Sequence, residues 1–133
     1  MLRPKALDHV GLKVTDMDKT VHFYSQVLGL ELLRTSGLNA DGGRSAVLKV
    51  GGQEINVFSR PAFAPVANDN TVGVDHFCLN MDAASIDDVM ADLRKAGVDN
   101  FRGPVERRDG TSVFVYDPDG VHVELRVAKG PSA

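Results

Sequence analysis

The 133-residue sequence predicts an α+β protein whose two halves share one order of elements: strand, helix and three strands. In several short segments apolar and polar residues alternate, which is typical of strands that bury one face. Two other segments place apolar residues at helical spacing and end at a glycine. Asp8-His9-Val10 also recurs as Asp75-His76-Phe77, 67 positions later. Because two units of half this length would be marginally stable alone, we expect a single domain, residues 1–133, made of two packed modules.

The first module, residues 6–59, begins with an alternating strand at Leu7–Val14. Thr15-Asp16-Met17-Asp18 then predicts a helix start, because an acid three residues after a threonine is typical of a capping box. The helix continues through apolar positions at helical spacing and ends at Gly29: Val21, Tyr24, Val27 and Leu28. The remaining expected elements are a strand at Leu30–Arg34, a turn at Leu38–Arg44, and a hairpin of Ser45–Val50 and Glu54–Phe58 joined by Gly51-Gly52.

Residues 60–71 contain two prolines and Asn68-Asp69-Asn70, which predicts a connector. The second module, residues 72–128, then repeats the order of the first. Its expected elements are a strand at Val74–Asn80, a helix from Ser85-Ile86-Asp87-Asp88 to Gly97, and strands at Val98–Arg102, Ser112–Tyr116 and Val121–Val127. Asp117-Pro118-Asp119-Gly120 has strong turn chemistry and separates the last two strands.

Composition excludes several classes of partner. Fifteen Lys+Arg against eighteen Asp+Glu give a net charge of -3, which offers no reason to expect a nucleic-acid partner. The single cysteine, Cys78, cannot form an intrachain disulfide and fits a reducing compartment. Met1–Lys5 is not followed by the apolar run of a signal peptide, and no segment approaches the roughly 20 apolar residues of a membrane span. We therefore expect a cytoplasmic protein with no membrane partner.

The histidines of the repeat fall on the more polar faces of their strands, because side chains alternate across a strand. His9 shares its face with Gly11 and Lys13, and His76 has the matching place in the second module. The polar faces of the other strands carry Glu54, Asn56, Glu124, His122 and Arg126.

If these faces converge, they gather His9, His76, Glu124 and Glu54. Two imidazoles with one or two carboxylates suit a divalent first-row metal ion: Ni, Zn, Co, Fe or Mn. No thiolate ligand is implied, which argues against a closed structural zinc site. A histidine in a strand is more often not a ligand, so the residues alone leave both interpretations open.

The same residues resemble the vicinal oxygen chelate superfamily, which includes glyoxalase I, bleomycin-resistance proteins and extradiol dioxygenases. The resemblance covers Leu7 to Val127, and its motifs are Leu7-Asp8-His9-Val10 with Thr15-Asp16, Phe23–Leu30, Asp75-His76-Phe77, Ala96-Gly97-Val98, and Asp117-Pro118-Asp119-Gly120 leading to Glu124. It implies two βαβββ modules that form a curled mixed sheet around a shared cavity, often completed by a second subunit. Exposed sheet edges also favour a homodimer.

The resemblance implies metal ligation by His9, His76 and Glu124, and a fourth ligand at Glu54 as in glyoxalase I. The residues expected to line the substrate cavity are Lys13, Asn56, Cys78, His122 and Arg126. The implied function is a metal-dependent, lactoylglutathione lyase-like lyase or isomerase for a small substrate with vicinal oxygens, such as a hemithioacetal formed with glutathione. Glu54 or Glu124 would move a proton between neighbouring carbons through an enediolate.

Three alternatives stay open within and beyond this chemistry. An extradiol dioxygenase would need a histidine that Glu106-Arg107-Arg108-Asp109-Gly110 does not contain, and a tyrosine where Phe114 stands. An acyl-CoA epimerase would use the same ligands and the same proton abstraction. A non-catalytic drug-binding protein of this superfamily typically loses the ligands that this sequence keeps, so bound metal separates this class from the enzymes.

Overall fold

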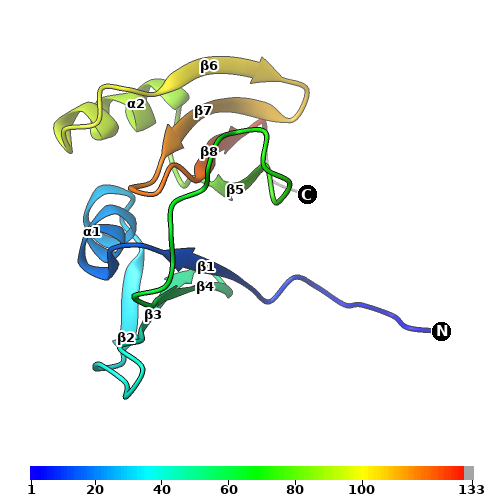
Figure 1. Cartoon of the computed structure of the whole chain (residues 1–133). Coiled ribbons are helices and arrows are strands. Elements are labelled where there is room, and N and C mark those ends of the chain that lie inside the picture. The colour runs from blue at the N-terminus through cyan, green and yellow to red at the C-terminus, as the bar shows by residue number, and fades with distance from the viewer. Residues whose placement is uncertain (131–133) are drawn as a thin grey trace. The chain divides into compact units, whose positions relative to one another are not determined.

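The structure is a computed structural model that describes residues 1–130 and divides the chain into two compact units, Met1–Ala67 and the residues from Asn68 onward. Each unit has the order strand, helix and three strands, and each has its own four-stranded mixed sheet (Figure 1). The predicted α+β class with two βαβββ modules is therefore confirmed.

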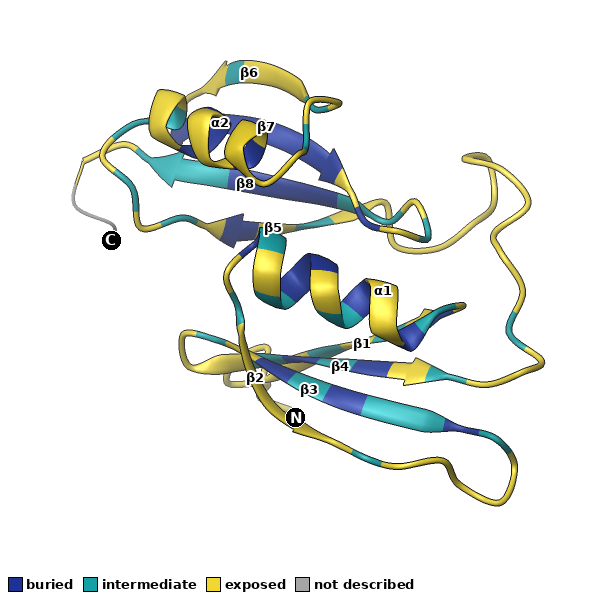
Figure 2. Ribbon diagram, turned by 90° about the vertical axis from the view of Figure 1, so that its left-hand side faces the viewer, coloured by how far each residue is buried: buried dark blue, intermediate teal, exposed yellow. Residues whose placement is uncertain are grey.

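The first unit packs one helical segment against a sheet with the strand order β1-β4-β3-β2. Its elements are β1 (His9–Val14), α1 (Met17–His22), η1 (Phe23–Val27), β2 (Glu31–Thr35), β3 (Arg44–Val50) and β4 (Gln53–Ser59). β1 and β4 pair in parallel, whereas β2, β3 and β4 pair antiparallel. Figure 2 shows α1 lying along one face of this sheet, where it contacts β3 and β4. The opposite face is therefore the one that carries His9.

The helix of the first unit differs in detail from the predicted one. Its N-cap is Asp16 rather than Thr15, because the Asp16 side chain accepts a hydrogen bond from the backbone N–H of Lys19 at 3.1 Å. The last turn widens into the π-helical segment η1, in which the N–H of Leu28 bonds the carbonyl of Phe23. Gly29 then has a φ of 82°, which allows the chain to leave the helix.

The second unit repeats this arrangement with the strand order β5-β8-β7-β6. Its elements are β5 (His76–Asn80), α2 (Ile86–Lys95), β6 (Arg102–Arg107), β7 (Gly110–Tyr116) and β8 (His122–Ala128). β5 and β8 pair in parallel, and β8, β7 and β6 pair antiparallel. α2 packs on the face that carries the fully buried Val113, Val115, Val123 and Leu125. His76 and Glu124 lie on the other face.

The predicted strand at Val98–Arg102 is wrong, because β6 begins where that strand was expected to end. After α2, the N–H of Val98 bonds the carbonyl of Leu93 and the N–H of Gly97 bonds that of Arg94. This pair of bonds is a Schellman motif, which uses the apolar residue after the glycine to close the helix. Val98 is thus part of the helix end, and its β-branched side chain misled the prediction. No helix within residues 1–130 has the length and apolar character needed to span a bilayer.

Candidate functional site

The parallel pairing of β5 and β8 brings all the predicted site residues of the second unit onto two neighbouring strands. The register places His76 beside His122, Cys78 beside Glu124, and Asn80 beside Arg126. Since all six have the same parity, their side chains share the face of the sheet opposite α2.

His76 and Glu124 form the central contact of this face. His76 Nε2 lies 3.1 Å from Glu124 Oε1. On the other side of the imidazole ring, Nδ1 donates a hydrogen bond to Asp75 Oδ2 at 2.7 Å. This hydrogen bond is the main cause of the lowered pKa of Asp75. The ring is thus oriented by one carboxylate and directed toward another.

Glu124 is held firmly in place. The residue is 7% exposed, and Oε2 accepts a hydrogen bond of 2.6 Å from the hydroxyl of Ser112 on β7, which is completely buried. Because Ser112 holds Oε2, Oε1 is the atom that faces His76. One imidazole nitrogen and one carboxylate oxygen therefore lie within hydrogen-bond distance of each other.

Cys78 is a poor candidate for a nucleophile. Its pKa is raised to about 11, first by burial of the thiol and then by the negative charge of the neighbouring Glu124. A thiol with such a pKa is protonated near neutral pH, and only the thiolate is strongly nucleophilic. The expected cavity-lining role of Cys78 stays a prediction.

The first unit carries a similar but not identical set of residues. His9 is exposed, and its Nδ1 donates a hydrogen bond of 2.8 Å to Asp8 Oδ2, as His76 does to Asp75. The parallel register of β1 and β4 places His9 beside Glu54 and Gly11 beside Asn56. The side-chain oxygen of Asn56 is buried and has no hydrogen-bond partner in residues 1–130.

The two registers show which residues correspond in the internal repeat. His9 corresponds to His76, so its neighbour Glu54 corresponds to His122. One step along the same face, Asn56 of the first unit corresponds to Glu124 of the second. The counterpart of the buried carboxylate is therefore an amide, and Glu54 lies two residues before it.

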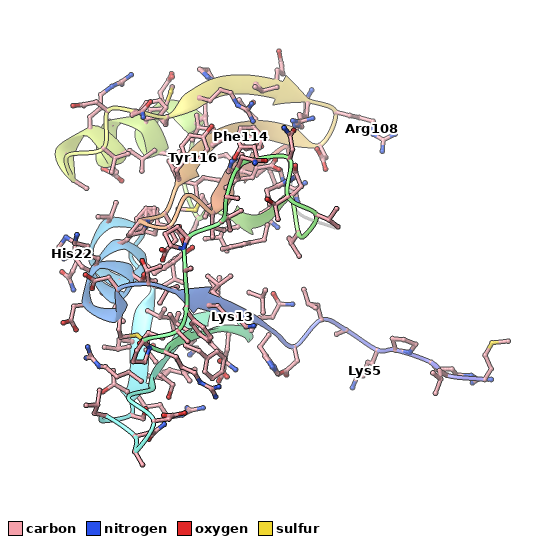
Figure 3. The ribbon with its side chains drawn as sticks, viewed as in Figure 1. Lys5, Lys13, His22, Arg108, Phe114 and Tyr116 are labelled. Atoms are coloured by element: carbon pink, nitrogen blue, oxygen red, sulfur yellow. The ribbon has the colours of Figure 1, made fainter. Side chains whose placement is uncertain are left out.

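The other predicted residues have contacts of their own. His122 packs edge-on against Tyr116, with 4.7 Å between the ring centroids, and Figure 3 shows Tyr116 and Phe114 projecting from β7. Arg126 donates hydrogen bonds to Asp109 and Asn80. Lys13 places its Nζ 5.3 Å from the centre of the Phe63 ring.

The predicted metal ligands are divided between the two units. His76 and Glu124 lie together in the second unit, and His9 and Glu54 lie side by side in the first. Within residues 1–130 no group of three or more His, Cys, Asp or Glu side chains is assembled closely enough to hold a metal ion. Two pockets of about 260 and 420 Å³, one on each unit, are lined by none of these four residues.

Sequence reasoning missed the residues that support the histidines and Glu124. Asp8 and Asp75 each precede a histidine, and this repeated Asp-His pair was the signal available in the sequence. Ser112 contacts Glu124 only through the pairing of β7 with β8, which no local pattern reveals.

The sequence matches the description Glyoxalase/Bleomycin resistance protein/Dioxygenase superfamily over residues 6–125. The chain belongs to this superfamily. It is 33% identical over 124 residues to the virulence protein STM3117 of Salmonella typhimurium, covering 90% of this chain and 81% of that protein. It is 31% identical over 142 residues to a probable lactoylglutathione lyase of Vibrio parahaemolyticus, covering 94% of this chain and 92% of that protein.

The structural comparison agrees with this membership. A glyoxalase family protein from Enterococcus faecalis superimposes with a TM-score of 0.76 and 26% identity, covering 92% of this chain and 97% of that one. Among superfamily members from plants, the chain spans less than half the length of the matched lactoylglutathione lyases, with 44% of the Arabidopsis thaliana protein GLX1 covered.

Proposed function

We propose that the chain is a metal-dependent, glyoxalase-like lyase or isomerase that acts on a small substrate with vicinal oxygens. Superfamily membership and the similarity of about 30% identity to lactoylglutathione lyases support this class of chemistry. The observation that carries the proposal is the pair formed by His76 Nε2 and Glu124 Oε1. The proposed ligands are His9, His76 and Glu124, with Glu54 as the fourth residue that the resemblance assigns.

The spacing and orientation of the histidines and Glu124 support a site for a divalent metal ion. Metal–nitrogen and metal–oxygen bonds of about 2.0–2.2 Å place two neighbouring ligand atoms roughly 3 Å apart when they meet near a right angle. The separation of 3.1 Å between His76 Nε2 and Glu124 Oε1 matches this value. Both His9 and His76 use Nδ1 to donate to an aspartate, which leaves Nε2 as the nitrogen that could bind the ion, an arrangement typical of metal-ligating histidines.

The metal ion and the glutamates would have different roles in a proton transfer. A bound ion would act as a Lewis acid that stabilises negative charge on two neighbouring substrate oxygens. Glu124, or Glu54 from the first unit, would accept a proton from one substrate carbon and return it to the neighbouring carbon. Ser112 keeps the Glu124 carboxylate in one orientation, with Oε1 on the side of His76.

Metal analysis and a direct assay test the proposal. We expect purified protein to bind about one equivalent of Ni, Co or Zn per chain, and to convert the hemithioacetal of methylglyoxal and glutathione, followed by ultraviolet absorbance. A metal-loaded protein without turnover would move the reaction toward the epimerase or dioxygenase alternatives. A protein that takes up none of these metals, nor Fe or Mn, would favour the non-catalytic binding protein instead.

Glu124→Gln separates a functional role of this side chain from a structural one. The amide keeps the shape of the side chain but loses the charge, so we expect loss of metal or of activity with an unchanged circular dichroism spectrum. Glu31→Gln, at an exposed position of β2, is the matched control and keeps both properties. Unchanged activity in Glu124→Gln would remove Glu124 from the site.

A second candidate function is oxygen chemistry, favoured by one observation. If Asn56 takes the place of a second carboxylate, the donor set is two histidines and one carboxylate, which is typical of non-haem Fe(II) oxygenases. Phe114, which pairs with Glu124, has no hydroxyl to offer as an acid or base. Oxygen consumption by the Fe(II)-loaded protein with catechol tests this candidate, and we expect none.

A further inference from the structure

Two arginines of the second unit lie over one aromatic ring. The Cζ atoms of Arg102 and Arg107, both on β6, are 4.7 and 5.8 Å from the ring centroid of Phe114. Phe114 itself is buried and belongs to β7. The ring thus makes cation–π contacts with two guanidinium groups at once. A contact of this kind between an arginine and an aromatic ring is common in proteins.

An irregularity in β6 places both arginines on the same face. Arg102 pairs with Phe114 and Val105 with Ser112, so β6 has one extra residue between these two pairs. Residues 102 and 107 are an odd number of positions apart and would lie on opposite faces of a regular strand. Because of this bulge, the side chains of Arg102 and Arg107 lie on the same face of the sheet. Bulges often change the direction of side chains near functional sites. Glu106 remains on the opposite face, because it pairs with Thr111.

The charges of the two arginines are not compensated by direct ion pairs. In the described part of the chain, neither Arg102 nor Arg107 has a carboxylate oxygen within 4.0 Å, whereas Arg126 lies 2.6 Å from Asp109. Asp75 lies within electrostatic range of Arg102, but its carboxylate accepts a hydrogen bond from His76. Within residues 1–130, neither guanidinium group therefore has a carboxylate in direct contact.

Phe114 connects this pair to the candidate site. Its ring packs edge-on against His76, with 6.0 Å between centroids, and its backbone pairs with Glu124. The same ring therefore touches both guanidinium groups and the imidazole of the donor pair.

We propose that Arg102 and Arg107 bind an anionic oxygen group, a carboxylate, phosphate or phosphonate, of the substrate. The planar guanidinium group presents a fork of N–H donors that matches the two oxygens of such a group. The proposed function has a metal ion hold two vicinal oxygens of the substrate. That the anionic group belongs to this same substrate rests on the proposed function. The anion site itself depends only on the second unit.

The first experiment tests the anion site in the metal-free protein. Inorganic phosphate and, separately, acetate are titrated at constant ionic strength while amide and arginine side-chain signals are followed by NMR. We expect saturable shifts at Arg102, Arg107 and Phe114, and their loss in the R102A/R107A variant. Arg94→Ala is the matched control. Arg94 lies on α2, and its Cζ atom is 5.2 Å from the ring centroid of a different aromatic residue, Phe101. The anion that gives the larger shifts identifies the preferred chemistry, and no saturable shift with either anion would overturn the proposal.

The second experiment tests whether the anion site and the metal ion bind the same ligand molecule. Acetohydroxamate, a neutral chelator with two vicinal oxygens, is compared with malonomonohydroxamate, which adds a carboxylate, on Co(II)-loaded protein by visible spectroscopy. We expect the carboxylate to strengthen binding about tenfold, and R102A/R107A to remove this gain while leaving acetohydroxamate affinity unchanged. A gain that survives in R102A/R107A would overturn the link. Failure of Co(II) itself to bind would count against the proposed function, and the phosphate titration would still decide the anion site.

Discussion

Glu124 is a buried carboxylate whose two oxygens are held by different partners. Burial of a carboxylate is costly unless hydrogen bonds or an opposite charge compensate for it. Here neither lysine nor arginine pairs with it in residues 1–130, and the partners are the Ser112 hydroxyl and the His76 imidazole. Such an arrangement fixes the orientation of the carboxylate, as hydrogen bonds to a metal-ligating carboxylate commonly do.

Ser112→Ala tests this positioning role. Loss of the hydroxyl leaves Oε2 without its hydrogen bond and frees the carboxylate to rotate, so we expect metal affinity to fall about 10- to 100-fold, the usual effect of removing a partner of a ligand. Competition with a chromophoric chelator measures the affinity. Ser45→Ala is the control, since the Ser45 hydroxyl bonds Ser36 in the first unit. Equal affinity in Ser112→Ala and the parent would show that Glu124 does not need this support.

At the scale of the elements, strand pairing decides which residues correspond between the two halves. β1 pairs with β4 as β5 pairs with β8, and both pairs are parallel. The counterpart of Glu124 is therefore Asn56, while Glu54 corresponds to His122. This correspondence favours one carboxylate in the donor set over two.

Paired substitutions on β4 distinguish the two possible fourth positions. We expect Glu54→Gln to change metal affinity less than about threefold, and Asn56→Glu to raise it at least tenfold, because a carboxylate binds a divalent ion more strongly than an amide does. Calorimetric titration with Ni or Zn measures both. If Glu54→Gln instead lowers the affinity as much as Glu124→Gln does, Glu54 is the fourth ligand.

The sequence predicted which face of a strand each side chain occupies and the hairpin of β3 and β4, but not which residues lie side by side in the parallel pairs. Alternation with a period of two placed His9, His76 and Glu124 on the correct faces, because it depends only on neighbouring residues. Whether Glu54 or Asn56 corresponds to Glu124 depends on the register between β1 and β4, which no local sequence pattern determines. The misplaced strand at Val98 and the bulge that turns Arg107 toward Phe114 have the same origin, since both are set by contacts between distant segments.

At the scale of the whole molecule, the proposed set of ligands includes residues of both units. His9 belongs to the first unit, and His76 and Glu124 belong to the second. An ion that binds all three prefers the folded chain, because the unfolded chain does not hold these residues together. Metal binding then raises the free energy of unfolding of the entire protein.

Metal-dependent melting tests this coupling. At a free concentration one hundred times the dissociation constant, the ion stabilises the folded state by about 2.7 kcal/mol, which raises the Tm of a chain of this size on the order of 10 °C. Scanning calorimetry with and without Ni or Zn measures the shift, and a chelator reverses it. We expect His9→Ala and His76→Ala each to lose most of the shift, because each removes a ligand from a different unit. His22→Ala keeps it, since His22 is exposed on α1 (Figure 3). A full shift in His9→Ala would mean that the second unit binds the ion alone, and that the first contributes nothing to the metal centre.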